Sequence, residues 1–379
     1  MAKKKICFVV AAPTSADGFL TEQIILLRKE YDIYLAANGE YGDEWKYVDI
    51  NDFYSFPIMR KISFLNDIKA VWHLAKYFRR MKFDAVHSIT PKAGLVCAMA
   101  GRLAGIKHRS HTFTGQVWAT RKGIMRKLLK CLDWVTAHLD NHIFVDGEGQ
   151  RRFIIKEGVV SEKKCKVLAN GSIGGIRVDR FNPSEEVRNA KRAELGISDE
   201  KVVFVFIGRL NRDKGCYELL SAFNELVKKC KNAYLLIFGG DEEGIVKTFP
   251  NYRNLIDREN FYYYGVTREM YNMLQAGDVF VLPTWREGFG VSVLEAQALM
   301  LPVITSDAYG VVDASVEGVT GLRVPVGNAH ALCRAMEQLY HDEALRKQYG
   351  KAGRERVLKD FRSEVVANAW LEFYHSILN

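Results

Sequence analysis

The chain has 379 residues, of which 48% are hydrophobic, and its formal net charge is +9. A chain of this length usually folds into two domains, and this hydrophobic content suffices for two buried cores. The charge is uneven, since residues 1–180 hold 30 Lys and Arg against 18 Asp and Glu, whereas the remainder holds 24 against 27. Such a basic half suits nucleic acid, anionic lipid or an anionic substrate. No zinc-finger or RNA-binding signature accompanies it, so nucleic acid is not expected as a partner.

Seven cysteines are scattered singly, without the paired spacing of a metal site or a disulfide framework. We interpret them as buried thiols in a reducing compartment. The apolar run at 6–12 resembles a short signal peptide, but the strand-then-helix pattern that follows favours a buried first strand. No apolar run approaches the ~18–20 residues of a transmembrane helix. The sequence therefore predicts a cytoplasmic protein that is soluble or peripherally attached to a membrane.

Strand-like apolar runs alternate with helical patterns along the chain. In the first half, strands are expected at 5–11, 32–37, 84–89, 108–113 and 141–145, and helices around 20–30, 65–80, 92–104, 121–139 and 147–157. The pattern restarts with strands at 202–208, 233–239, 261–264, 278–282 and 302–305, and helices at 215–230, 267–275, 291–300 and 328–340. This alternation is typical of doubly wound α/β domains, and it predicts two of them.

Clustered glycines at 170–175, followed by Asn182-Pro183, break the periodicity and mark the expected linker. The predicted domains are therefore 1–175 and 176–360. Residues 361–379 follow them and contain a helical pattern from Ser363 to Leu378. One stripe of that helix is apolar. Its residues are Val365, Val366, Ala369, Trp370, Phe373 and Ile377.

Two glutamates flank a strand-to-helix turn in the second half of the chain. Glu287 lies in the loop after the strand at 278–282, and Glu295 lies on the next helix, with seven residues between them. A carboxylate accepts hydrogen bonds from two adjacent hydroxyls, as in a sugar or a ribose. Gly288 and Gly290 let the backbone approach a ligand, and the helix start favours a phosphate. Two Glu at this spacing also recur by chance, so the pattern alone leaves both interpretations open.

A second candidate motif follows the apolar strand at 202–208, which delivers Arg209 and Lys214 beside a helix start. In open α/β sheets, ligands gather at the carboxyl ends of the strands, so this loop and the Glu287 loop are expected at one edge. Two cations there would compensate a diphosphate leaving group. Taken singly, each cation also fits an ordinary solvated loop.

Taken together, these motifs resemble the retaining glycosyltransferases of family 4. The resemblance is specific over about residues 200–325 and looser toward both ends. It implies the GT-B fold, in which two doubly wound Rossmann-like domains face a cleft and a C-terminal helix crosses back to the first domain. The matching residues occur in family order: Gly208 to Leu210 with Lys214-Gly215, Asp278, Glu287 to Glu295, Pro302 to Ile304, and Gly318 to Gly321.

The resemblance implies roles for individual residues of this chain. Arg209 and Lys214 match residues that bind the diphosphate, Glu287 a residue that contacts the donor sugar, and Glu295 one that contacts the ribose. Other positions implied to bind the donor are Phe289, Gly290, Val291, Val266 and Gly18. The chain also departs from the family pattern, because a Gly-Gly pair is missing from the loop that contains Gly18. No Asp-x-Asp triplet occurs, so no metal or other cofactor is expected.

The first domain is expected to bind the acceptor, and its clearest candidate is the segment from His111 to Trp118 after the strand that ends near Thr112. A histidine beside a strand is often only structural. His111 also matches a family histidine that faces the donor sugar, where it could donate a hydrogen bond or transfer a proton.

Basic amphipathic helices in the same domain are candidates for contact with an anionic membrane. In the first, Arg121, Lys122, Arg126, Lys127 and Lys130 accompany an apolar stripe of Ile124, Leu128, Cys131, Leu132 and Val135. A second candidate spans 58–82. The alternative is that both apolar stripes face the domain core and the charges are solvated.

The sequence thus predicts a peripheral membrane enzyme that moves a sugar, with retention, from a nucleotide donor to a lipid-linked saccharide. The donor is expected to be a UDP-sugar and the transferred unit a hexose or an N-acetylhexosamine. Domain closure is expected to exclude water. The alternatives are a nucleotide-sugar epimerase or phosphorylase of the same fold, or a catalytically silent accessory protein.

Overall fold

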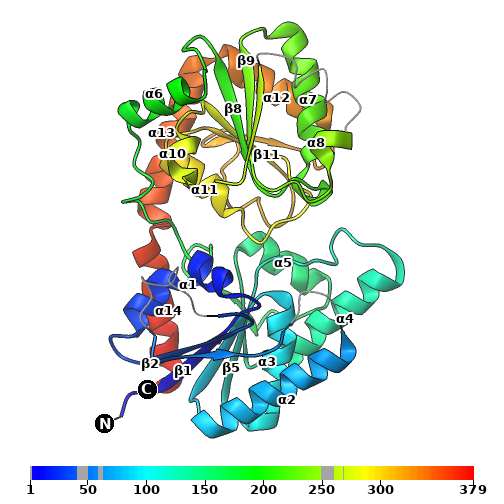
Figure 1. Cartoon of the computed structure of the whole chain (residues 1–379), viewed down its shortest axis with the longest axis vertical. Helices are drawn as coiled ribbons and strands as arrows, with labels where there is room; N and C mark the ends of the chain where they lie inside the picture. Colours follow the sequence, from blue (N-terminus) through cyan, green and yellow to red (C-terminus); the bar gives the residue numbers. More distant parts are fainter. Residues whose placement is uncertain (1, 41–49, 59–62, 249–259, 268) are drawn as a thin grey trace. The chain divides into compact units, whose positions relative to one another are not determined.

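The computed structural model describes residues 2–40, 50–58, 63–248, 260–267 and 269–379. The chain divides into two compact units (Figure 1). The first unit consists of residues 1–175 and 363–379, and the second of residues 176–362.

The first unit is built on a seven-stranded parallel sheet with the order β3-β2-β1-β4-β5-β6-β7. Helices cover both faces of this sheet, so burial does not alternate along its central strands, and even the polar His87 and Ser88 of β4 are buried. The strands are β1(Lys5–Val9), β2(Asp32–Ala37), β3(Asp52–Ser55), β4(Ala85–Ile89), β5(His108–Phe113), β6(His142–Val145) and β7(Cys165–Val167).

Two groups of helices pack on the sheet of the first unit. Helices α1 and α14 pack together against one face, where Ile6 and Phe8 of β1 point. Helices α2, α3 and α4 lie beside one another on the other face (Figure 1), and Cys7 and Val9 point toward it. The helices are α1(Pro13–Leu27), α2(Phe64–Met81), α3(Pro91–Ala104), α4(Gly123–Leu139), α5(Glu148–Lys156) and α14(Ser363–Leu378).

A buried polar cluster attaches α14 to the first unit. His87 of β4 is fully buried, and its Nδ1 lies 2.9 Å from the Tyr374 hydroxyl while its Nε2 lies 2.8 Å from Thr112 Oγ1. The Trp370 ring stacks on the imidazole at 4.6 Å. The helix predicted near the C-terminus therefore completes the core of the first unit.

The second unit contains a six-stranded parallel sheet with the order β10-β9-β8-β11-β12-β13. Its strands are β8(Val202–Ile207), β9(Ala233–Phe238), β10(Phe261–Gly265), β11(Val279–Leu282), β12(Val303–Ser306) and β13(Gly321–Val324). Its helices are α6(Glu185–Glu194), α7(Cys216–Lys229), α8(Ile245–Thr248), α10(Met270–Leu274), α11(Val291–Ala298), α12(Ala329–His341) and α13(Glu343–Asp360), with a 3-10 turn at Arg212–Lys214.

All ten predicted strands are present, but three short edge or near-edge strands, β3, β7 and β13, were not expected. Helices α6, α8 and α13 were also missed. Helix α8 has only four residues, and α6 and α13 are almost entirely polar and lack a clear apolar stripe. The first helix begins at Pro13, earlier than expected, since proline is tolerated in the first turn of a helix. The doubly wound α/β prediction is confirmed for both halves.

Candidate functional site

The second sheet reverses its strand order between β8 and β11, which are hydrogen-bonded neighbours. Such a switch point is where ligands bind in open α/β sheets, at the carboxyl ends of the strands. The loop after β8 carries Arg209 and Lys214, and the loop after β11 carries Glu287. The fold therefore brings together the two motifs that the sequence singled out.

Backbone contacts lock these two loops together. Gly215 has a φ of +70°, and a Cβ at this position would overlap the Pro283 carbonyl oxygen. Asp213 connects the same loops, because its carbonyl oxygen accepts from the Trp285 N–H at 2.8 Å and its carboxylate accepts from Arg286 Nε at 2.8 Å. The sequence assigned no role to Asp213, since it looked like one more solvated charge in a loop.

Arg209 and Lys214, the two residues predicted to bind the diphosphate, each pair with a carboxylate of the protein. Lys214 Nζ donates to a carboxylate oxygen of Glu287, and both side chains are mostly buried. Arg209 is exposed and donates to both carboxylate oxygens of Glu242, at 3.1 and 3.2 Å. A bound diphosphate would thus have to compete with two carboxylates for these cations.

Glu295 stands apart from this network. It lies in the middle of α11, which begins after Gly290, whose φ is +89°. Within the described part of the chain, no hydrogen bond or ion pair reaches its carboxylate. Burial raises the pKa of Glu295 from its ordinary value of 4.5 to about 7. An acceptor without a partner, partly removed from water, is suited to take hydrogen bonds from a ligand's hydroxyls.

The remaining residues predicted to bind the donor lie in different surroundings. Val291 opens α11, and Val266 is exposed in the loop after β10, near Gly240. Phe289 is 2% exposed and packs on Phe361, so its side chain belongs to the core and only its backbone could face a ligand. For Gly18, the expected placement in a loop is wrong, while its contact with the donor stays a prediction. It lies inside α1 rather than in a loop, because that helix already begins at Pro13.

His111 lies within β5, whose bounds are those of the strand predicted at 108–113. Its side chain is fully buried beneath Gly94 of α3 instead of facing a ligand. Its Nδ1 lies 2.9 Å from Ser88 Oγ, whereas its Nε2 has no hydrogen-bond partner. Burial lowers the pKa of His111 to about 3, so the ring is neutral near pH 7. The imidazole thus contributes to the core, and the loop itself begins only at Thr114.

The first sheet has its own switch point, between β1 and β4, and the sequence did not single out the residue that follows β4 there. Thr90 has φ +78° and ψ 141°, which is rare for a β-branched residue, and its buried hydroxyl oxygen has no hydrogen-bond partner. Strained residues of this kind cluster at functional sites. Its only sequence signal is its place between a strand and Pro91.

Asp278, one of the matched motif residues, has a structural task. Its carboxylate accepts from Arg188 at 2.5 Å, from Arg192 at 2.6 Å and from the Val203 N–H at 2.7 Å. It therefore fastens α6 to the amino ends of β8 and β11, far along the strands from the Glu287 loop.

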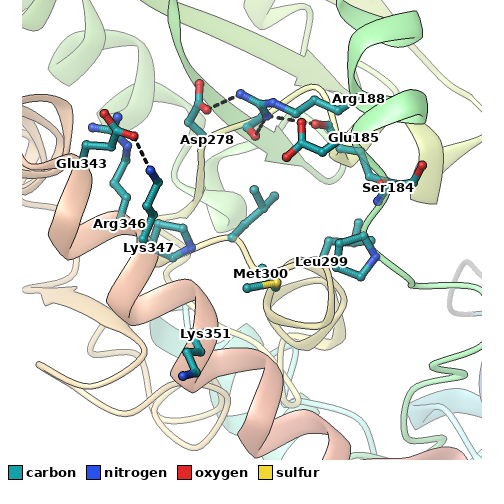
Figure 2. Close-up of a pocket in the computed structure, with 15 residues that line it drawn as sticks. Ser184, Glu185, Arg188, Asp278, Leu299, Met300, Glu343, Arg346, Lys347 and Lys351 are labelled. Atoms are coloured by element: carbon teal, nitrogen blue, oxygen red, sulfur yellow. Dashed lines mark hydrogen bonds and ion pairs between the residues drawn. The ribbon is translucent and has the colours of Figure 1, made fainter.

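A pocket of about 620 Å³ lies beside this cluster. Figure 2 shows Arg188 reaching Asp278, and Arg346, Lys347 and Lys351 following one another along α13. The pocket is lined by residues that precede β11 and β12, such as Asp278 and Pro302. It thus opens at the amino edge of the sheet, opposite the candidate donor site.

The helix predicted to touch a membrane is α4, and two of its basic residues turn inward. Arg126 and Lys130 both pair with Glu157 of the first unit, at 2.9 and 2.7 Å, and both lie over the Trp118 ring. Both side chains therefore make contacts within the unit and are only partly exposed. Arg121, Lys122 and Lys127 are exposed. Arg60 and Lys61, basic residues of the second candidate segment, lie outside the described residues.

None of the described helices combines the length and apolar character that crossing a bilayer requires. Across the described ranges, no three His, Cys, Asp or Glu side chains are grouped so that they could hold a metal ion. Of the seven cysteines, Cys131 is exposed and the other six are buried, so the expectation of buried thiols is wrong for that residue.

Comparison with known proteins identifies the class. A model of the group 1 glycosyl transferases matches residues 187–356, and a model of the glycosyl transferase 4-like domain matches residues 26–171. The capsular polysaccharide biosynthesis glycosyltransferase CapM of Staphylococcus aureus is 30% identical over 378 residues, which cover 100% of this chain and 98% of CapM. This chain therefore belongs to glycosyltransferase family 4 and is a glycosyltransferase.

Two further proteins are similar to the chain. The Escherichia coli UDP-Gal:alpha-D-GlcNAc-diphosphoundecaprenol alpha-1,3-galactosyltransferase is 28% identical over 298 residues, which cover 77% of this chain and 75% of that enzyme. The solved structure of Anabaena HepE in complex with UDP has a TM-score of 0.80 at 17% identity, covering 98% of this chain and 100% of HepE. At that identity the likeness establishes the fold, which is GT-B.

Proposed function

We propose that this glycosyltransferase moves a hexose or N-acetylhexosamine from a UDP-sugar to a lipid-linked saccharide at the cytoplasmic face of a membrane. The observation that carries the proposal is the meeting of two cations and two carboxylates at the switch point of the second sheet. Glu295, which has no partner there, is assigned to the ribose. Arg209 and Lys214 are assigned to the diphosphate and Glu287 to the sugar. The UDP of the HepE complex and the UDP-Gal donor named for the E. coli relative support the choice of nucleotide.

The acceptor class rests on two relatives. The E. coli enzyme is named for a sugar-diphosphoundecaprenol acceptor, and a Campylobacter jejuni relative, 25% identical over 321 residues, for a diphospho-undecaprenol acceptor. Both names describe a saccharide joined through a diphosphate to a polyprenol. The basic first half of this chain, with its charge excess over residues 1–180, would attract such an anionic acceptor and the membrane that holds it.

The proposed mechanism retains the anomeric configuration through attack on the face that the diphosphate leaves. The bond from the anomeric carbon to the diphosphate oxygen breaks, and the acceptor hydroxyl oxygen forms its bond on the same side. The hydroxyl proton passes to the departing diphosphate oxygen. Arg209 and Lys214 stabilise the growing negative charge, so Lys214 must exchange Glu287 for the phosphate. Glu287 is then free to accept hydrogen bonds from the donor sugar, and it forms no covalent intermediate.

The decisive experiment incubates the protein with each UDP-sugar and a short-chain polyprenyl diphosphate saccharide, and detects the product by mass spectrometry. The proposal expects one donor to extend the acceptor by one residue, and it expects NMR of the product to give an anomeric proton coupling that shows retention. It also expects unchanged rates in EDTA, because we propose no metal requirement. Free nucleotide without an extended acceptor, or an isomerised donor, would support a hydrolase, phosphorylase or epimerase instead.

A further inference from the structure

Helix α4 turns its apolar stripe away from the protein. Ile124 is 85% exposed, Leu128 46% and Trp134 44%, and Cys131 between them is exposed as well. The charges that would normally occupy a solvated face, Arg126 and Lys130, instead point inward to Glu157. The usual arrangement of a surface helix is thus largely inverted. Of the predicted stripe, Ile124, Leu128 and Cys131 face away from the domain core, whereas Leu132 and Val135 are half-buried.

The two helices beside α4 carry further exposed apolar side chains. Leu65 and Trp72 of α2 are 72% and 60% exposed, and Leu103 of α3 is 48% exposed. Since α3 lies between α2 and α4 (Figure 1), these residues share one side of the first unit. We call this set the apolar face. It comprises Leu65, Ile68, Trp72, Met99, Leu103, Ile124, Met125, Leu128 and Trp134.

The charges on the three helices have one sign. Their exposed charged residues are all basic, namely Lys69, Lys76, Arg79, Arg80, Arg102 and Lys127, and Arg121 and Lys122 immediately precede α4. Only two acidic residues occur on these helices. Asp67 pairs with Lys92 at 2.7 Å, and Asp133 is buried against the Trp118 N–H at 2.7 Å. A large exposed apolar surface marks an interaction site, and its basic surroundings specify an anionic partner.

We infer that the apolar face inserts into the interfacial region of an anionic lipid bilayer, with the basic residues around it contacting the headgroups. Aromatic and aliphatic side chains together with Lys and Arg are the combination found on interfacial helices. A second copy of the chain is a poorer partner, because a two-fold contact would bring this face against itself and place like charges together.

The position of the apolar face explains how the bilayer would serve the reaction. Helix α2 follows β3 and α4 follows β5, so both helices begin at the carboxyl edge of the first sheet. Leu65 and Trp72 lie in the first half of α2, and Ile124 and Leu128 in the first half of α4. The bilayer would therefore lie beside the edge where Thr90 sits and where ligands of such sheets bind. This orientation rests on the proposed lipid-linked acceptor, whereas insertion itself does not.

Tryptophan quenching tests the insertion directly. The intact protein is mixed with vesicles of phosphatidylcholine and phosphatidylglycerol whose acyl chains are brominated, and Trp emission is followed. We expect strong quenching in the parent protein and its loss in the double variant Trp72→Phe, Trp134→Phe, which should still sediment with vesicles because phenylalanine remains apolar. Trp285→Phe in the second unit is the matched control. If the double variant is quenched as strongly as the parent, the inference is wrong.

A second pair of variants separates lipid from other partners. Trp72→Gln, Ile124→Gln and Leu128→Gln together should lower affinity for these vesicles by roughly 100-fold, since each removes an exposed apolar side chain that would insert into the bilayer. Arg121→Gln, Lys122→Gln and Lys127→Gln together should lower it by roughly fivefold per charge at low salt and much less at high salt. All six positions are exposed, so folding should be unaffected.

Transfer to a short-chain soluble acceptor distinguishes failure of this inference from failure of the proposed function. The apolar variant should transfer as fast as the parent protein. Full vesicle binding by the apolar variant, with conversion of a dimer to a monomer in sedimentation velocity, would show that a second copy covers this face and would overturn the inference. A parent protein that binds vesicles but transfers no sugar would refute only the proposed function.

Discussion

Lys214 donates a hydrogen bond to the Glu287 carboxylate. The residue predicted to bind the diphosphate is thus paired with the residue predicted to bind the donor sugar. This contact joins the loop after β8 to the loop after β11, and Asp213 reinforces it through Trp285 and Arg286. Donor binding would exchange this ion pair for two contacts to the ligand. The contact therefore connects binding of the diphosphate to release of the carboxylate that positions the sugar.

The proposed role of Lys214 predicts a phosphate-specific defect. Lys214→Ala should weaken UDP binding by about 10–100-fold, because a hydrogen bond to a charged group contributes roughly 1.5–3 kcal/mol. Binding of uridine, which has no phosphate, should not change. Calorimetry with both ligands measures this, with Lys351→Ala at the opposite edge of the sheet as the control. An equal loss for uridine would show that Lys214 supports the loop rather than the diphosphate.

Glu295 predicts a pH-dependent stability. Its pKa is about 7 in the folded protein against an ordinary value of 4.5, so the folded state holds the extra proton between these values. The stability contributed by Glu295 should fall as pH rises from about 4.5 to about 7, by up to roughly 3 kcal/mol. Glu295→Gln should become more stable relative to the parent protein across this window. Urea unfolding of both proteins at pH 5 and pH 8 tests the sign, and parallel curves would contradict it.

The same carboxyl predicts a pH-dependent affinity for UDP. Ribose hydroxyls donate to the ionised carboxylate, so binding should lower the pKa of Glu295 and release a proton. UDP affinity should therefore rise with pH up to about 7 and then level off. Calorimetry in two buffers of different ionisation enthalpy detects the proton, and Glu295→Gln should abolish its release.

Gly94 and His111 predict a packing defect with a rescue. A Cβ on Gly94 would overlap the buried His111 ring, so Gly94→Ala should destabilise the protein by about 1–3 kcal/mol. In the double variant Gly94→Ala, His111→Ala, the alanine methyl enters the space left by the ring, and part of the loss should be recovered. Chemical unfolding of the two single variants and the double variant gives the coupling energy. Strict additivity would show that the ring and the helix do not share this space.

Asp278 predicts a loss of stability that leaves UDP affinity intact. Asp278→Asn removes the charge that pairs with Arg188 and Arg192, and breaking a buried ion pair costs about 3–5 kcal/mol. Because Arg188 is partly exposed, we expect the loss of stability to lie near the lower end of this range. Thermal unfolding measures the loss, and calorimetry below the transition should show unchanged UDP binding. A selective loss of UDP binding would place Asp278 in the donor site.

Strands such as β8 and β9 were readily predicted, because helices cover both sides of each sheet and these strands are apolar on both faces. β3 and β7 lie at the sheet edges, where exposed residues such as Lys166 erase the apolar pattern. Helix α6 is attached to its unit through ion pairs to Asp278. A contact of this kind leaves no apolar stripe in the sequence from which the helix could be predicted. Periodicity therefore reveals burial in the core and misses elements attached through charge.

The candidate site was partly predictable for a related reason. Arg209, Lys214 and Glu287 lie in the segments that follow β8 and β11, and Glu295 lies on the helix after the second of them, so their edge of the sheet could be inferred from topology. The strand that contains His111 was predicted with the observed bounds of β5, but burial of the imidazole beneath Gly94 of α3 depends on tertiary packing that the sequence pattern does not show. The orientation of α4 could not be predicted either. Arg126 and Lys130 pair with Glu157, which lies more than twenty residues farther along the chain.

The central claim is that Glu295 and Glu287 contact different rings of a UDP-sugar, and one calorimetric comparison tests it most directly. UDP is titrated into the parent protein, Glu295→Ala and Glu287→Ala. We predict that Glu295→Ala weakens binding by about 10–100-fold, as expected for losing a charged hydrogen-bond acceptor. Glu287→Ala should bind UDP at least as tightly as the parent protein, because it frees Lys214 for the diphosphate, and it should still fail to transfer sugar. Equal losses in the two variants, or no UDP binding by the parent protein, would contradict the account.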